Sequence, residues 1–313
     1  MPDSFVVTAA ITVEGLRKSY GSVEAVKGVD FEVREGEVFA LLGPNGAGKT
    51  TIVEILEGYR QRTEGRVEVL GADPFVGGRA LRERVGIVLQ ECGLDPYLTV
   101  AETVLHTGRC YPSPRPVGDL LELVGLDEKA GDRVKTLSGG QQRRLDLALA
   151  LVGDPDLIFL DEPTTGFDPS ARRNAWDIVE GLCNLGKTVL LTTHYMDEAQ
   201  HLADRVAVIR AGVIVAEGSP ASLGGRDTAA VRIRFRPPDG RALPPVGAGA
   251  RPDPEHPGYV VLETAEPTRV LHALTGWAID QGVELIGLTV TRPSLEDVYL
   301  ELTEDSASDG SAP

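Results

Sequence analysis

The chain is poor in positive charge. Its 313 residues include 31 lysines and arginines against 47 aspartates and glutamates, which gives a formal net charge of −16. Proteins that bind the phosphate backbone of nucleic acids need clustered basic side chains. Nucleic acid is therefore not an expected partner.

Cysteines and long apolar runs are also scarce. The three cysteines, Cys92, Cys110 and Cys183, lie far apart without the spacing of metal ligands, which favours a reducing cytoplasm. No stretch approaches the roughly 18 uninterrupted apolar residues of a membrane span, and the N-terminus lacks the basic and apolar segments of a secretory signal. If the protein serves a membrane, we expect another chain to span it.

Short apolar runs alternate with helical patterns from Ile11 to about Gly218. Runs such as EVFALLG (37–43) and KTVLLTTH (187–194) are continuous, which is typical of strands buried on both faces of a parallel sheet. The stretch VEAVKGVDFEV (23–33) alternates instead and predicts an antiparallel strand. The pattern predicts an α/β fold.

The character of the sequence changes twice more along the chain. No convincing strand appears between about residues 95 and 151, so a helical insertion is expected there. Beyond about Gly218, strand-like and helical stretches surround a loop rich in proline and glycine, which predicts a small α+β domain. We therefore expect an N-terminal extension (1–10), a main domain with its helical subdomain (11–220), a C-terminal accessory domain (221–303) and a disordered tail (304–313).

A glycine-rich loop follows the predicted strand at 37–43. The segment GPNGAGKTT matches G-x-x-x-x-G-K-[ST] between a strand and a helix, where backbone N–H groups can converge on phosphate oxygens. Lys49 would add a charge on those oxygens and Thr50 a hydroxyl for Mg²⁺. The predicted phosphate loop comprises Gly43, Pro44, Asn45, Gly46, Ala47, Gly48, Lys49, Thr50 and Thr51.

Two acids close another buried run, DLIFLDEP (156–163). Ligands of open α/β sheets bind where strands end in this way. Asp161 would hold Mg²⁺ through water, and Glu162 would orient or deprotonate the attacking water. The alternative is a loop that merely caps the next helix.

A third motif, TLSGGQQRR (136–144), begins a predicted helix in an unusual way. Ser138 and Gln141 have the spacing of a capping box, yet Gly139 and Gly140 occupy the first turn, where each glycine costs roughly 1 kcal/mol relative to alanine. A helix that needs only a cap would not carry them. We expect a ligand to approach this helix end closely.

In this order, GPNGAGKT, LSGGQ and LIFLDEP resemble the nucleotide-binding subunit of an ABC transporter over about residues 11–218. The resemblance implies a P-loop NTPase core with an antiparallel β subdomain and a helical insertion. It also implies ATP and Mg²⁺ as ligands, bound between two copies of the chain arranged head to tail. One copy would then offer the residues Ser138, Gly139, Gly140 and Gln141 to the γ-phosphate that the other copy holds.

Four further residues match functional positions of that family. Tyr20 would stack on adenine, and His194 would contact the γ-phosphate. Gln90 would touch Mg²⁺ and the attacking water and relay nucleotide state to the membrane subunit. Asp168 is the key acid of the loop through which family dimers touch, and Phe167 stands beside it where leucine is usual.

Other stretches, including RRLDLALALVGDP and the late PSLEDVYLELT, are similar to daunorubicin-resistance type bacterial ABC export ATPases and their C-terminal appendage. The resemblance implies a peripheral ATPase on the cytoplasmic membrane face that drives efflux of hydrophobic, drug-like compounds through a separate permease. Two alternatives stay open: an ABC-type ATPase acting on ribosomes or DNA, and a P-loop kinase of small molecules, which would leave LSGGQ unexplained.

Overall fold

The structure, a computed structural model, describes residues 8–88, 93–226, 229–238, 243–247, 249–254 and 256–304. The chain divides into two compact units, Met1–Pro220 and Ala221–Pro313. Over the described ranges, none of the helices has both the length and the apolar character needed to cross a bilayer.

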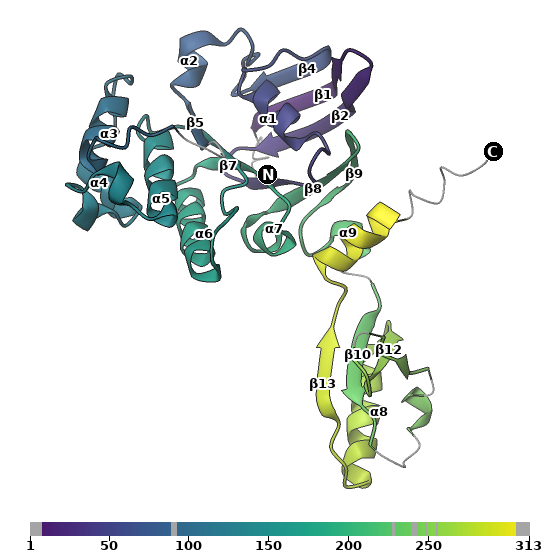
Figure 1. The fold of residues 1–313 in the computed structure, drawn as a ribbon. Coiled ribbons are helices and arrows are strands. Elements are labelled where there is room, and N and C mark those ends of the chain that lie inside the picture. Colours follow the sequence, from purple (N-terminus) through teal and green to yellow (C-terminus); the bar gives the residue numbers. More distant parts are fainter. Residues whose placement is uncertain are drawn as a thin grey trace, which may run out of the picture. The chain divides into compact units, whose positions relative to one another are not determined.

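A six-stranded sheet forms the centre of the first unit (Figure 1). Five of its strands are parallel, and β9 pairs antiparallel with β8 at one edge. β3 and β7 are buried at every position, as their continuous apolar runs predict. In spatial order the strands are β5 (Val85–Val88), β6 (Leu157–Asp161), β7 (Thr188–Thr193), β3 (Val38–Leu42), β8 (Arg205–Arg210) and β9 (Val213–Gly218).

A separate three-stranded antiparallel sheet has the order β2-β1-β4. The strands are β1 (Ala9–Tyr20), β2 (Val23–Arg34) and β4 (Glu64–Val69). Burial alternates along the second half of β2, which confirms the expected antiparallel strand. Helix α1 (Lys49–Leu56) contacts β2, β4 and β6, so it joins this sheet to the larger one (Figure 1).

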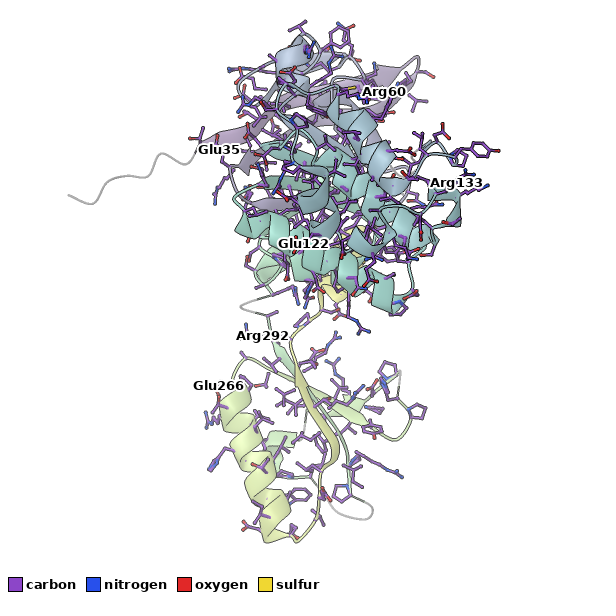
Figure 2. All side chains as sticks on the ribbon, turned by 90° about the vertical axis from the view of Figure 1, so that its left-hand side faces the viewer. Glu35, Arg60, Glu122, Arg133, Glu266 and Arg292 are labelled. Atoms are coloured by element: carbon purple, nitrogen blue, oxygen red, sulfur yellow. The ribbon has the colours of Figure 1, made fainter. Side chains whose placement is uncertain are left out.

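Helices make up the insertion between β5 and β6, as predicted. They are α3 (Val100–Gly108), α4 (Val117–Leu123), the 3₁₀ turns η1 (Asp127–Lys129) and η2 (Val134–Thr136), and α5 (Gly139–Ala150). Exposed charged side chains such as Glu122 and Arg133 cover its outer surface (Figure 2). The other helices of this unit are α2 (Gly78–Arg82), α6 (Pro169–Asn184) and α7 (Met196–Leu202).

The second unit is a small α+β structure, as the sequence predicts. Its antiparallel sheet has the order β11-β12-β10-β13, and buried side chains such as Ile233 and Phe235 pack against Leu274 of the long helix. The elements are η3 (Leu223–Gly225), β10 (Val231–Arg236), η4 (Pro245–Gly247), β11 (Arg251–Pro252), β12 (Val260–Thr264), α8 (Pro267–Asp280), β13 (Ile286–Thr291) and α9 (Leu295–Glu304). The short β11 and η4 lie in the stretch that was expected to be a loop.

An acidic side chain is half-buried at the end of α1. Glu57 caps the helix and lines a cavity of about 410 Å³ together with Leu56, Phe75 and Leu81. Burial, and secondarily the nearby carboxylates of Asp161 and Glu54, raises the pKa of Glu57 from 4.5 to about 8. Between pH 4.5 and about pH 8 the folded chain keeps a proton that the unfolded chain has lost. This group therefore lowers the free energy of unfolding as pH rises.

The substitution Glu57→Gln should remove this pH dependence. Relative to the variant, the wild-type free energy of unfolding should fall between about pH 5 and about pH 8, by at most ~1.4 kcal/mol per pH unit. Chemical denaturation at several pH values measures the difference. Exposed Glu35 (Figure 2) provides the matched control Glu35→Gln, and parallel curves for wild type and Glu57→Gln would contradict the expectation.

Candidate active site

The loop between β3 and α1 is constrained by its neighbours. A Cβ atom added at Gly43 would lie 2.3 Å from the carbonyl oxygen of Ile209. Gly48 precedes α1 with φ of 110°, and a Cβ there would lie 2.8 Å from the carbonyl oxygen of Ala25. Only glycine fits both positions, so the backbone of the loop is held close to β8 and β2 while α1 begins at Lys49.

Lys49 is almost buried, with 5% of its side chain exposed. Its Nζ donates hydrogen bonds to the carbonyl oxygens of Gly43, at 2.6 Å, and Pro44, at 3.2 Å. Burial lowers the pKa of Lys49, and the nearby Glu162 and Asp161 carboxylates oppose that effect. Nζ lies 3.8 Å from Oε1 of Glu162, so the cation at the start of α1 faces the acid that directly follows β6.

Asp161 ends β6, and Glu162 follows with φ of 46°, a left-handed conformation that is rare for residues with a side chain. Thr192 of β7 supports both acids: its hydroxyl donates to Oδ1 of Asp161, and its hydroxyl and carbonyl oxygens each accept from the Glu162 N–H at 3.1 Å. The hydroxyl of Thr165 donates to Oε2 of Glu162 at 3.1 Å. Strained backbone held by surrounding bonds is common at functional sites.

His194 follows β7, and its Nδ1 lies 3.2 Å from Oε1 of Glu162. The structure therefore brings Lys49, Glu162 and His194 together although they come from three parts of the chain. All three follow parallel strands at the carboxyl edge of the sheet, where such folds bind ligands. The arrangement places a cation, a carboxylate and an imidazole around one point, which suits phosphate chemistry.

A second group of predicted residues lines a different cavity, of about 860 Å³. Ser138, Gly139, Gly140 and Asp168 line it together with Glu162, whereas the phosphate loop does not. Ser138 precedes α5, and its hydroxyl accepts from the N–H of Gln141. The Gln141 side-chain oxygen accepts from the Ser138 N–H at 2.9 Å, which confirms the predicted capping box.

Among the residues that the structure describes, no steric contact requires the two glycines of this helix start. A Cβ added at Gly139 would meet no atom within 4 Å, and one at Gly140 would lie 3.8 Å from Cβ of Ala171. Neither residue has a positive φ. The described residues therefore leave the N-terminal start of α5 open to approach by a ligand.

The remaining predicted residues are placed as follows. Tyr20 ends β1 with 40% of its surface exposed, and its ring centroid lies 5.1 Å from Nζ of Lys18 and 5.2 Å from Cζ of Arg60. Asn45, Ala47, Thr50 and Thr51 belong to the loop and the first turn of α1. Gln90 lies outside the described residues.

Sequence reasoning missed the residues that support the acids. Besides Thr192 and Thr165, Arg143 of α5 donates from its guanidinium to the carbonyl oxygens of Asp161, at 3.1 Å, and Pro163, at 3.2 Å. The signal was present in QQRR, where an arginine follows the glycines by one helical turn. Helix α5 is thus bonded to the segment that ends β6 and carries Glu162.

Comparisons with known proteins agree with this geometry. Residues 26–165 match the family model "ABC transporter", and residues 231–294 match "ABC transporter domain-containing protein-like, C-terminal domain". The chain is 41% identical to Nod factor export ATP-binding protein I of Paraburkholderia xenovorans, over 94% of this chain and 97% of that protein. It is 39% identical to a daunorubicin resistance ATP-binding protein of Streptomyces coeruleorubidus, over 95% and 96%.

Among solved structures, an ATP-binding cassette of an ABC transporter in its ADP conformation matches with a TM-score of 0.61 and 26% identity, over 68% of this chain and 91% of that one. A dimeric cassette in a post-hydrolysis state with ADP and phosphate matches with a TM-score of 0.60 and 28% identity, over 67% and 98%. Sequence identity of 39% and 41% over nearly the full length of both chains shows the family. The chain therefore belongs to the ATP-binding, ATP-hydrolysing subunits of the ABC transporter family.

Proposed function

We propose that the chain is the motor subunit of a bacterial exporter that expels hydrophobic, drug-like compounds. The observation that carries the ATPase role is the convergence of Lys49, Glu162 and His194 at one edge of the sheet. The export role is supported by relatives whose names specify Nod factor export and daunorubicin resistance. In this proposal residues 11–220 are the motor and 221–303 an accessory domain.

The residues around the loop have separate tasks in this proposal. The loop N–H groups and Lys49 hold the β- and γ-phosphates, and Tyr20 stacks on adenine. Glu162 orients the attacking water and accepts its proton, while His194 contacts the γ-phosphate. Lys49, Glu162 and His194 already face the same point, so these three side chains need little reorganisation for the reaction.

A magnesium ion fits the oxygen donors at this edge. The hydroxyl of Thr50 and the carboxylate of Asp161 are hard ligands of the kind that Mg²⁺ prefers, and Gln90 would add an amide oxygen. The described residues contain no group of three or more acidic, histidine or cysteine side chains that could hold a metal alone. In this proposal phosphate oxygens and water complete the coordination of the ion. When bound, Mg²⁺ would neutralise charge on the transferring phosphoryl group.

The variant Glu162→Gln should retain ATP binding and lose turnover. Glutamine keeps the size of the side chain but cannot accept the proton, so kcat should fall roughly 10²–10⁴-fold. Phosphate release and nucleotide binding measure the two properties, and size-exclusion chromatography should show an ATP-bound dimer. Wild-type hydrolysis by this variant would remove the assignment.

We further propose that two copies bind ATP between them, head to tail. The open N-terminal start of α5, with Ser138, Gly139 and Gly140, would meet the γ-phosphate held by the other copy. It would offer its N–H groups and helix dipole to that phosphate. Asp168 lines the same cavity and would lie at the contact between copies. This arrangement accounts for two glycines that no steric contact in the described part of the chain requires.

Replacing Gly139 with leucine tests this arrangement. A Cβ at this position meets no atom of the described residues within 4 Å, so the variant should fold and bind ATP as a monomer. It should fail to form the ATP-bound dimer and to hydrolyse ATP. Gly131→Leu is the matched control, since a Cβ there also meets nothing within 4 Å. Equal loss of monomer binding and hydrolysis would mean that the glycine is only structural.

A separate permease is the proposed membrane partner. Phe75 and Val76 expose 47% and 75% of their surfaces and line the cavity of about 410 Å³, which also includes Tyr111 and Leu149 of the helical insertion. Adjoining exposed apolar side chains are typical of protein interaction sites when they form a contiguous patch. We propose that a cytoplasmic segment of the permease binds here, as the transport role requires a membrane partner in contact with the motor.

Co-purification with a multi-spanning protein tests the permease and separates transport from action on ribosomes or DNA. Val76→Asp should weaken that association and leave the ATPase activity of the isolated subunit near that of the wild type, because a charge opposes burial of this surface. Val23→Asp, at a residue 63% exposed and away from this cavity's lining, is the control. Unchanged association would place the permease elsewhere.

A further inference from the structure

A stack of side chains extends from His194 to α6. The ring centroids of His194 and Tyr195 lie 4.0 Å apart, and Cζ of Arg172 lies 4.4 Å from the centroid of the Tyr195 ring. Arg172 also donates to Oδ2 of Asp197 at 3.0 Å. The guanidinium is therefore positioned by an acid on α7 and covers the tyrosine, which in turn packs against the histidine.

This stack supports the orientation of His194. Its Nδ1 lies 3.2 Å from Oε1 of Glu162, but this buried atom has no well-aligned hydrogen bond within the described residues. The contact with Glu162 thus does not fix the ring by itself. Tyr195 can do so, because its N–H donates to the Thr193 hydroxyl at 2.9 Å and the Arg172 guanidinium packs on its ring.

Arg172 is attached to the loop that follows Glu162. The N–H of Arg172 donates to the carbonyl oxygen of Asp168 at 3.0 Å, and the Asp168 side chain accepts from the N–H of Ala171 at 2.9 Å. Asp168 and Phe167 line the cavity beside the N-terminal start of α5. A shift of this loop would therefore move the first turn of α6 and the arginine with it.

Glu198 provides further contacts between α6 and α7. The fully buried Glu198 accepts through Oε1 from the Thr164 hydroxyl, at 2.8 Å, and from Nε1 of Trp176, at 3.2 Å. These three residues join the segment after Glu162 to both helices. Displacement of the start of α6 should accordingly be transmitted to α7 and not absorbed between the helices.

We propose that Arg172 is a positioning residue that, through Tyr195, holds His194 toward Glu162 and couples this orientation to the loop at residues 167–168. The proposal rests on the proposed ATPase mechanism and the head-to-tail dimer. It assigns to the stack the task of aligning His194 when a second copy contacts the loop. Within the described residues, the Arg172 side chain bonds to Asp197 and forms no hydrogen bond or ion pair with Glu162 or the phosphate loop.

The effect should appear in kcat and not in ATP affinity. Misplacement of a catalytic group by a remote change can cost about 10²-fold, so we expect Arg172→Ala to lower kcat by about ten- to a hundredfold with KM within about twofold. Arg172→Lys should lose nearly as much, since an ammonium can pair with Asp197 but lacks the planar face that stacks on tyrosine. Tyr195→Phe, which keeps the ring, should retain activity, whereas Tyr195→Leu should behave like Arg172→Ala.

The neighbouring Arg173→Ala provides the matched control, because Arg173 is exposed and the substitution makes the same change in charge. Melting temperature and ATP binding should stay close to wild type for Arg172→Lys. The double variant Arg172→Ala/Tyr195→Leu should lose no more kcat than the poorer single variant, since both remove one stack. Any of three results would overturn the proposal. They are a loss of kcat in the double variant equal to the product of the single losses, a wild-type kcat in Arg172→Lys, and equal effects of Arg172→Ala and Arg173→Ala.

This result is separable from the proposed function. If Glu162→Gln still hydrolyses ATP at the wild-type rate, the ATPase assignment fails and the stack has no reaction to serve. If Glu162→Gln is inactive and the Arg172 variants match Arg173→Ala, only the positioning role is removed.

Discussion

The buried contact between Lys49 and Glu162 is the constraint on which this active site depends. Their charged atoms lie 3.8 Å apart, with 5% and 14% of the side chains exposed. Neither charge would tolerate such burial alone, because desolvation of an unpaired ion is expensive. The pair requires β3 and β6 to end at the same level, which the parallel order β6-β7-β3 provides with one strand between them. That intervening strand contains Thr192 and is followed directly by His194, so the alignment of three neighbouring strands positions the whole site.

Local patterns explain why much of this could be predicted from the sequence. Continuous apolar runs identified the buried strands, the glycines and Lys49 identified the phosphate loop, and the acids at 161 and 162 identified the edge of the sheet. The capping box at Ser138 was predictable because it depends on residues three apart. Each of these features is encoded within about ten residues, and strand order then brings the features together.

Other parts depend on contacts between distant segments and could not be predicted in this way. In the sequence, Thr192 is an ordinary strand residue, and its role depends on β7 lying beside β6. Arg143 is likewise an ordinary helix residue, and its role depends on the contact between α5 and Pro163. The left-handed conformation of Glu162 has no local signal, since glutamate carries no preference for it. The short β11 lies in a loop rich in proline and glycine, and pairing with β12 supplies the order that its sequence does not.

The open start of α5 has a genetic consequence if two copies complete each other's sites. Each composite site would draw its glycines from one copy and its Glu162 from the other. A chain defective at Gly139 and a chain defective at Glu162 would then form a mixed pair with both defects in one site and none in the other. Two inactive alleles could in this way restore one working site, whereas either allele alone would leave both sites impaired.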